Sequence, residues 1–324
     1  MLIGLTYDLK SSYLAMGYTP EQVAEFDSEE TVEAIEQTLQ NLGYQTERIG
    51  NILELTTALA TGKRWDLVFN IAEGMYGKGR EAQIPALLEA YRIPFTFSDA
   101  FTMTITLDKA ATKSLISRYG VRTGFFTEIT NPDSICLEQF QFPLFVKPVA
   151  EGTGKGIRGK STANSPQELK QMVEQLWFEF QQPVLVEEYL PGREFTVGIW
   201  GTGPKASVIG VMEIIFNNPL SHGVYNYHTK ANYKELVSYE PCKEPIAHEI
   251  ARQALIAYNA LNCRDAGRVD IRLNSHNEPV FIEINPLAGL NPIDSDLPIL
   301  SRLHGIEYQQ LIETIVNSAR ERIG

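Results

Sequence analysis

The chain reads AGRVDIRLNSHNEPVFIEIN over residues 266–285, and this stretch decides the fold of its C-terminal part. Polar and apolar residues alternate on both sides of Asn274–Asn277, which is typical of two β-strands joined by a turn. Pairing the strands as a hairpin around Ser275 and His276 predicts that Arg268 lies opposite Glu283. Asp270 and Asn285 then fall on the same face.

The other face of this hairpin is expected to anchor it in a core through its apolar residues: Val269, Ile271, Val280, Ile282 and Ile284. On the polar face, two carboxylates, an amide oxygen and a guanidinium converge. Oxygen ligands without His or Cys suit Mg2+, and Arg268 beside them could stabilise charge on a phosphoryl group or a tetrahedral species. A solvated face with cross-strand ion pairs is the alternative. The loop after Asn285, rich in Pro and Gly, favours the metal site.

Strands and helices alternate in the first part of the chain, which predicts a parallel sheet. Asp27 with Glu30 resembles a capping box ahead of a helix whose apolar residues recur up to Leu42. From about Leu144 the chain becomes richer in strands, so the predicted class is α/β, with α+β character in the C-terminal half. Residues 217–235 predict a long functional loop. Strands are expected at 2–7, 66–71, 144–149, 184–189, 194–200 and 206–216, and helices at 84–91, 108–119, 166–176 and 246–261.

The chain has 324 residues and a net charge of −12, which weighs against nucleic acids and anionic membranes as partners. No apolar run approaches the length of a membrane span, and no signal peptide is evident at Met1, so we expect a cytoplasmic protein. The cysteines have no disulfide or zinc-like spacing and are expected to be small buried residues: Cys136, Cys242 and Cys263.

Residues 154–161, GKGIRGKS, fit the Walker A pattern of P-loop proteins. That pattern needs a helix to begin at its Lys-Ser, whereas Ser165-Pro166 predicts a helix start about four residues later. A Gly-rich hairpin, or a flap whose backbone amides cover phosphates, therefore fits better than a P-loop. If the P-loop were correct, Lys160→Ala would abolish turnover and Lys147→Ala would not.

Taken in order, the motifs of this chain resemble the D-alanine–D-alanine ligase family of the ATP-grasp superfamily. The resemblance spans nearly the whole chain, and the ordered set is more specific than any one motif. The motifs are Phe69-Asn70-Ile71-Ala72-Glu73-Gly74, Leu107-Asp108-Lys109-Ala110-Ala111-Thr112-Lys113, Phe145-Val146-Lys147-Pro148 with Glu151-Gly152-Thr153, Glu187-Glu188-Tyr189-Leu190-Pro191-Gly192-Arg193-Glu194, Gly267-Arg268-Val269-Asp270 and Glu283-Ile284-Asn285-Pro286.

This resemblance implies an ATP-grasp fold in three domains: an N-terminal doubly wound parallel-sheet domain (1–100), a small central lobe (101–185) and a C-terminal lobe with the metal and substrate site (186–324). It implies an ATP-dependent carboxylate–amine ligase that joins two amino acids, or similar acids and amines, through an acyl phosphate, with release of ADP and phosphate. Small-molecule substrates and a homodimer are also implied. A non-catalytic nucleotide-binding relative, acting as a sensor or scaffold, is the alternative.

The resemblance also implies site residues. Lys109 and Lys147 match lysines that hold phosphates, and Asp270, Glu283 and Asn285 match ligands of two Mg2+ ions, which Mn2+ could replace. Arg268 matches the arginine that steadies the acyl phosphate. Without the resemblance, these lysines and glutamates would be interpreted as surface residues. With Arg268, the residues Thr153 and Lys230 are expected to be catalytic. The remaining matches are the flap residues Gly152, Thr153 and Gly154, the adenine and ribose residues Glu187, Glu188, Leu190, Glu194 and Ile282, and the substrate residues Glu73, Lys230, Gly289 and Asp294.

The sequence departs from the family mainly where the amino acids bind. Thr6–Tyr13 lacks the family's ammonium-binding glutamate, and Lys78–Ala82 replaces its Gly-Glu-Asp-Gly. Lys230-Ala231 keeps the lysine but not the tyrosine of the family's pair. Asp294 stands where a serine binds the second substrate's carboxylate, or it caps the helix expected at 296–303. The identity and stereochemistry of the substrates, the pathway and the oligomeric state do not follow from the sequence.

Overall fold

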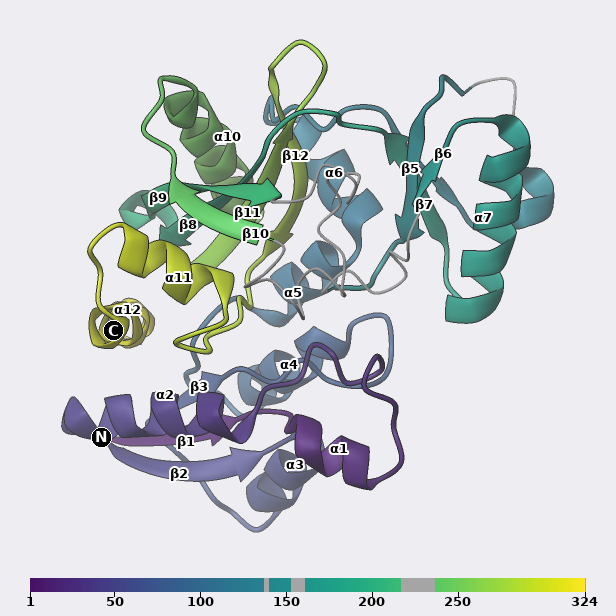
Figure 1. Cartoon of the computed structure of the whole chain (residues 1–324). Coiled ribbons are helices and arrows are strands. Elements are labelled where there is room, and N and C mark those ends of the chain that lie inside the picture. Colours follow the sequence, from purple (N-terminus) through teal and green to yellow (C-terminus); the bar gives the residue numbers. More distant parts are fainter. Residues whose placement is uncertain (137–139, 153–160, 217–236, 324) are drawn as a thin grey trace.

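The computed structural model describes residues 1–136, 140–152, 161–216 and 237–323. Its N-terminal part is a parallel sheet in the order β2-β1-β3, as the alternation predicted (Figure 1). A parallel bridge from Val68 to Phe95 extends it. The elements are β1 (Leu2–Thr6), α1 (Lys10–Ala15), α2 (Glu29–Asn41), β2 (Gln45–Gly50), α3 (Ile52–Ala60), β3 (Leu67–Asn70), the short 3₁₀ turn η1 (Arg80–Ala82) and α4 (Gln83–Ala90).

The cap of α2 differs from the sequence-based expectation. Ser28, not Asp27, stands at the N-cap, and its hydroxyl accepts the backbone N–H of Thr31. The apolar residues of α2 face the sheet because they recur at helical spacing. Since Ser28 does the capping, the carboxylate of Asp27 is available to line a pocket.

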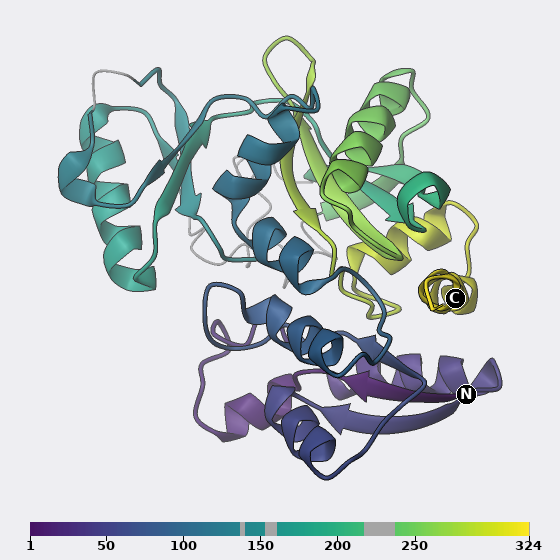
Figure 2. The same cartoon turned by 180° about the vertical axis from the view of Figure 1, so that it is seen from behind.

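The central part holds an antiparallel sheet in the order β4-β7-β5-β6, covered by α7. Ser165 caps α7 by accepting the backbone N–H of Glu168, with Pro166 in the first turn, as predicted. Figure 2 shows this part standing apart from the N-terminal sheet. The elements from α5 onward are α5 (Ala100–Leu107), α6 (Lys109–Ser117), β4 (Phe126–Ile129), η2 (Pro132–Ser134), β5 (Leu144–Pro148), β6 (Thr162–Ala163), α7 (Pro166–Phe180) and β7 (Val184–Glu188).

The C-terminal part is built on an antiparallel sheet in the order β10-β9-β8-β11-β12. One face packs against α10 and α6 in an apolar core. On the other face α11 covers β8 and β9 through a smaller apolar cluster, and the polar side chains of β11 and β12 lie beside it. The combination of a parallel sheet and antiparallel sheets confirms the predicted mixed class. The elements are β8 (Glu194–Trp200), η4 (Gly203–Lys205), β9 (Ser207–Phe216), β10 (Val237–Pro241), α10 (Ile246–Ala260), β11 (Ala266–Leu273), β12 (Pro279–Asn285), α11 (Asp296–Leu303) and α12 (Tyr308–Glu321).

The hairpin of β11 and β12 forms, but its predicted register is wrong. Arg268 pairs with Asn285, and Asp270 pairs with Glu283. The register shifts after Asp270, so that Ile282 is the additional residue of a β-bulge. A bulge breaks the alternation of faces. As a result the core cluster contains Phe281 rather than Val280 and Ile282, whereas Val269, Ile271 and Ile284 lie in it as expected.

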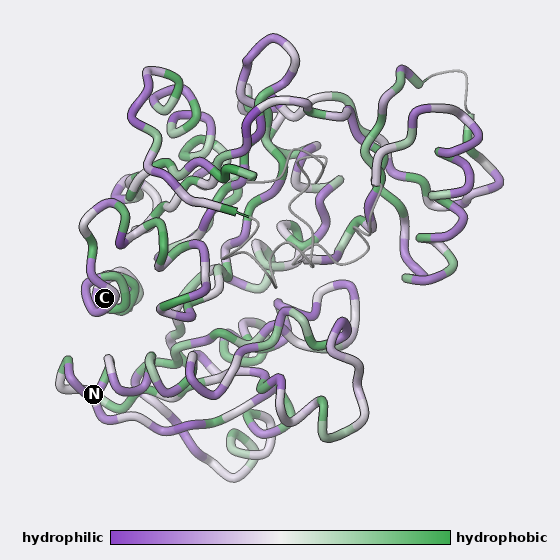
Figure 3. The backbone as a smooth tube through the Cα atoms, in the orientation of Figure 1, coloured by the Kyte–Doolittle hydropathy of each residue, from purple (hydrophilic) through white to green (hydrophobic). Residues whose placement is uncertain are grey.

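The C-terminal helix α12 returns to the N-terminal sheet. Its apolar residues Leu311, Ile315 and Ala319 share one core cluster with Val32 and Leu39 of α2. The two helices lie side by side in Figures 1 and 2. Figure 3 shows green and purple residues interspersed along the helices, as expected where one face of each is buried. This packing places the loop that follows β12 against the N-terminal part.

The three cysteines differ in their exposure. Among the cysteines, Cys263 is buried as expected, but Cys136 is exposed and Cys242 is half-buried. Within the described residues, no helix is long and apolar enough to span a membrane. The loop expected at 217–235 lies outside the described residues, as does the glycine-rich turn at 153–160.

Candidate active site

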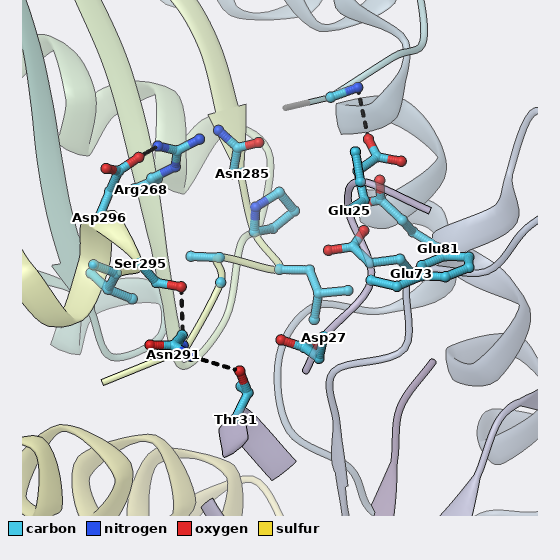
Figure 4. A pocket seen from close by; sticks show the side chains of 18 of the residues that line it. Glu25, Asp27, Thr31, Glu73, Glu81, Arg268, Asn285, Asn291, Ser295 and Asp296 are labelled. Carbon is cyan, nitrogen blue, oxygen red and sulfur yellow. Dashed lines mark hydrogen bonds and ion pairs between the residues drawn. The ribbon is translucent and has the colours of Figure 1, made fainter. Parts of the chain in front are cut away.

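A pocket of about 390 Å³ opens between the N-terminal part, α5 and α6, and the end of β12 (Figure 4). One wall comes from residues 24–31 and from Glu73 and Glu81, and the opposite wall comes from residues 283–297 with Arg268. The pocket thus joins parts of the chain more than 200 residues apart. The residues predicted from sequence that line it are Glu73, Lys109, Gly152, Arg268, Glu283, Asn285, Gly289 and Asp294.

The polar face of β11 and β12 gathers the predicted metal ligands. Asp270 and Glu283 are directly opposite each other, closer than the predicted register implied. The Asn285 side-chain amide donates to Asp270 Oδ2 at 3.3 Å, and the Thr196 hydroxyl donates to Asp270 Oδ1 at 2.8 Å. The site therefore offers two carboxylates and an amide oxygen, which are donors that Mg2+ accepts.

Arg268 is buried at the floor of the pocket. Its guanidinium forms an ion pair with Asp296, the first residue of α11, and lies 3.4 Å from Asp270 Oδ2. Asp294, by contrast, is exposed at the pocket rim, where its backbone N–H donates to the Asn291 side chain at 3.0 Å. Ser295 stands at the N-cap of α11, so the alternative prediction that Asp294 caps this helix is wrong.

Lys109 lies between Glu151 and the predicted metal ligand Glu283. Asp108 caps α6 by accepting the Ala111 backbone N–H, which fixes Lys109 at the first helical position. The Lys109 ammonium donates to the Glu151 carbonyl at 2.6 Å and lies 3.5 Å from Glu283 Oε2. Its buried stem and these contacts hold a positive charge at the edge of the oxygen-rich face.

The wall from the N-terminal part is acidic (Figure 4). Burial raises the pKa of Asp27 to about 7, partly offset by Lys10 and increased by Asp8. Burial likewise raises the pKa of Glu81 to about 7, against the opposing effect of Arg80. Burial and the neighbouring Glu81 and Glu25 raise the pKa of Glu73 well above its ordinary value. Carboxylates crowded in this way favour a cation beside them.

Glu25, on the same wall, connects the N-terminal part to the base of the glycine-rich turn. Its carboxylate accepts the backbone N–H of Gly152 at 2.8 Å and pairs with Arg80 at 3.1 Å. Arg80 also donates to the Ala150 carbonyl at 2.9 Å. Both charged side chains are buried, so this contact fixes the position of Gly152 relative to the acidic wall.

The predicted nucleotide residues lie on β5, β7 and β8. Lys147 and Glu187 form a buried ion pair at 2.7 Å. Burial lowers the pKa of Lys147, but Glu187 and Glu283 outweigh it and raise the pKa. The Glu188 side chain accepts the Phe125 backbone N–H at 3.4 Å, and Glu194 pairs with Arg272 at 3.2 Å.

Two other predicted nucleotide residues, Leu190 and Ile282, lie on the described part of the chain. Leu190 and Ile282 are half-buried, and the bulge removes Ile282 from the core face. The predicted residues Thr153, Gly154 and Lys230 lie outside the described residues. Within the described part, no three His, Cys, Asp or Glu side chains form a cluster suited to a metal, so the amide of Asn285 would be needed as a ligand.

Comparison with known proteins decides the family. The family described as "D-ala D-ala ligase C-terminus" matches residues 122–317. A D-alanine–D-alanine ligase of Aquifex aeolicus is 31% identical over 288 residues, which cover 88% of this chain and 93% of the relative. The chain belongs to the D-alanine–D-alanine ligase family. It is therefore an enzyme, a ligase that forms a peptide-type C–N bond.

Solved structures agree with this assignment at the level of the fold. The D-alanine–D-alanine ligase of Bacillus anthracis, complexed with ATP, has a TM-score of 0.73 and 22% identity, with 100% of both chains covered. The VanG D-Ala:D-Ser ligase of Enterococcus faecalis has a TM-score of 0.76 and 20% identity, covering 98% of this chain and 99% of that one. The ATP-grasp fold with an N-terminal parallel-sheet domain, expected from the motifs, is confirmed.

Several residues that line the pocket were not predicted from the sequence. Glu25, Asp27, Glu81 and Asp296 all line the pocket, and none of them was singled out as a site residue. Glu25 supplies a glutamate in the N-terminal part, whereas the stretch Thr6–Tyr13 contains none. Only a distance in space, not a spacing in sequence, could reveal it. Lys113 could have been singled out from the sequence. It lies four residues after Lys109 in the same motif, so both lysines fall on one face of the expected helix.

Proposed function

We propose that this ligase activates a carboxylate with ATP and then joins it to an ammonium-bearing substrate held by the acidic wall. ATP is a substrate: a carboxylate oxygen attacks its γ-phosphorus, which gives an acyl phosphate and ADP. The amine then attacks the acyl carbon, so that the C–N bond forms as inorganic phosphate leaves. The observation that carries the proposal is a single pocket in which Arg268, Glu283 and Asn285 face Glu25, Asp27, Glu73 and Glu81.

We assign the phosphates to Lys109 and Lys147, with Gly152, Thr153 and Gly154 covering them. Glu187, Glu188, Leu190, Glu194 and Ile282 are assigned to the adenine and ribose. Asp270, Glu283 and Asn285 would hold Mg2+, two ions as in the resemblance, or Mn2+. When bound, such an ion would neutralise phosphate charge. The predicted domain boundaries, 1–100, 101–185 and 186–324, place the nucleotide between the second and third domains.

Arg268 is the residue of this chain that faces the reacting group. Its guanidinium lies beside Asp270 and at the pocket floor, so it can donate to oxygens on which negative charge develops. Asp296 holds the guanidinium in place. An arginine side chain that is already ordered loses less conformational entropy when it binds the reacting group. Lys230 and Thr153 remain proposed contributors on the basis of the resemblance alone.

The acidic wall sets the chemistry of the amino-acid half. Burial raises the pKa values of Asp27, Glu73 and Glu81, and an ammonium placed among them would lower those pKa values again. Asp294 and Gly289 at the rim are assigned to the second substrate. Asp294 would repel a carboxylate, so a substrate with a cationic group near this rim fits better than D-alanine.

Panels of D- and L-amino acids, including diamino acids, test this proposal when they are incubated with ATP and Mg2+. We expect ADP release that depends on the amino acid, and a dipeptide-type product in the mass spectrum. D-alanyl-D-alanine as the preferred product would contradict the altered amino-acid half. If no acceptor leads to ADP release, the result would favour the alternative function, a non-catalytic nucleotide-binding sensor or scaffold. We further propose a cytoplasmic enzyme of small-molecule substrates, acting as a homodimer without nucleic-acid or membrane partners.

A further inference from the structure

Lys113 is a buried lysine to which the proposed reaction gives no role. Only 2% of its surface is exposed. Its ammonium donates to the Phe281 carbonyl at 2.9 Å and to the Thr123 carbonyl at 3.4 Å. These contacts connect α6 with β12 and with the segment that precedes β4. An ammonium buried this deeply requires partners, because desolvation penalises its charged form and lowers its pKa.

The third partner of Lys113 is Glu187 on β7. Glu187 Oε2 lies 3.1 Å from the Lys113 ammonium, and Glu187 Oε1 lies 2.7 Å from the Lys147 ammonium. Burial alone would raise the pKa of Glu187, but the two lysines outweigh burial and hold the pKa below its ordinary value. One buried carboxylate is thus shared between two buried ammonium groups.

Sharing matters because the two lysines have different neighbours. Lys113 is bound to main-chain carbonyls on β12 and before β4, which fix it. Lys147 stands on β5 and is the residue assigned to the nucleotide phosphates. If Glu187 had Lys147 as its sole counterion, turning that ammonium toward a phosphate would leave a buried carboxylate uncompensated. Such an uncompensated charge is strongly unfavourable.

We propose that Lys113 is a positioning residue that neutralises Glu187, so that Lys147 is available to the phosphates of the bound nucleotide. This assignment rests on the proposed function, because the role of Lys147 does. In this assignment Lys113 itself contacts neither the nucleotide nor the amino-acid substrates. It acts through Glu187, and its effect therefore depends on the phosphates of the nucleotide and on the charge of residue 187.

Binding of ADP and of adenosine, measured by calorimetry on the full chain, tests the assignment. Lys113→Gln keeps a donor for the Phe281 carbonyl but removes the charge. We expect this variant to bind ADP at least tenfold more weakly than the wild type and to bind adenosine less than threefold more weakly. Lys113→Arg, which keeps the charge, should hold the ratio of the two affinities within threefold of the wild type. Lys170→Gln, an exposed lysine on α7, is the matched control.

The decisive comparison is the double variant Lys113→Gln/Glu187→Gln. Because Glu187→Gln removes the charge that would retain Lys147, we expect the double variant to recover most of the ADP-to-adenosine ratio and to fold even if Lys113→Gln alone does not. A ratio that stays low in the double variant, or is unchanged in Lys113→Gln, would overturn the assignment. Failure of the wild type to bind ADP would instead overturn the proposed function.

Discussion

Arg268 of β11 forms an ion pair with Asp296, the residue that begins α11. The pair joins the hairpin that carries the predicted metal ligands to the helix that begins in the same wall of the pocket. Both side chains are about nine-tenths buried. The arginine is therefore held in position by a carboxylate that lies outside the sequence motif in which it occurs.

Replacing Arg268 should affect turnover more than nucleotide binding. Arg268→Gln removes a donor that acts on developing negative charge, so we expect kcat to fall by about 10²–10³-fold, with ADP affinity within threefold of the wild type. Steady-state ADP release and calorimetry measure the two quantities. Arg252→Gln, an exposed arginine on α10 paired with Glu249, should leave both unchanged. A parallel loss of binding and turnover would contradict this role.

The oxygen ligands should matter through the metal ion. We expect Asp270→Asn and Glu283→Gln each to raise the Mg2+ concentration needed for half-maximal turnover by at least about tenfold, because each removes one charged ligand. A titration of ADP release against Mg2+ measures this, and chelation with EDTA should abolish activity in the wild type. Glu278→Gln, at the exposed end of the same hairpin, serves as the control. An unchanged Mg2+ requirement in both variants would remove these residues from the metal site.

The stability of the protein should depend on pH through Asp27. Its pKa is raised to about 7 by burial, so between about pH 4 and pH 7 the unfolded chain loses this proton while the folded chain keeps it. Stability therefore decreases as pH rises through this range and is level above it. Lys10 and Asp8 are the charged groups that act on Asp27.

The measurement compares Asp27→Asn with the wild type by urea unfolding at pH 5 and pH 8. We expect the free energy of unfolding of Asp27→Asn, relative to that of the wild type, to be higher at pH 8 than at pH 5 by about 1 kcal/mol. The figure is small because the pocket admits water. Asp133→Asn, an exposed aspartate in η2, is the control and should show no such gain. A difference that is the same at both pH values would show that Asp27 has an ordinary pKa.

Arg80 should stabilise the contact between the N-terminal part and residues 150–152. Arg80→Met leaves Glu25 buried without its guanidinium, and we expect a loss of about 3 kcal/mol in the free energy of unfolding. Urea unfolding measures the loss, and Lys78→Met, an exposed neighbour, is the control. Arg80→Met/Glu25→Leu should recover at least half of it. If the double variant is no more stable than Arg80→Met, the ion pair is not the cause.

Local patterns determined much of the fold. The Ser165-Pro166 helix start and the strands of the 266–285 hairpin follow from capping and from alternation, which act between residues close in the chain. The prediction that Asp27 caps α2 was wrong, because the neighbouring Ser28 is also a residue type that caps helices and occupies the N-cap position. The predicted hairpin register was already wrong by one residue next to the turn, where Leu273 pairs with Pro279, and the bulge at Ile282, which leaves no mark in the alternation, adds a second residue.

The sequence by itself determined the family and singled out Arg268, Asn285, Lys109 and Lys147 as candidate site residues, because ordered motifs carry these residues. Only the tertiary structure decided that Glu25, Asp27 and Glu81 form an acidic wall, that Asp296 holds Arg268 and that Glu187 is shared by two lysines. The physical reason is that charges interact through distance in space. Packing of α12 on α2 and of α6 on β12 sets those distances, and no spacing along the chain encodes them.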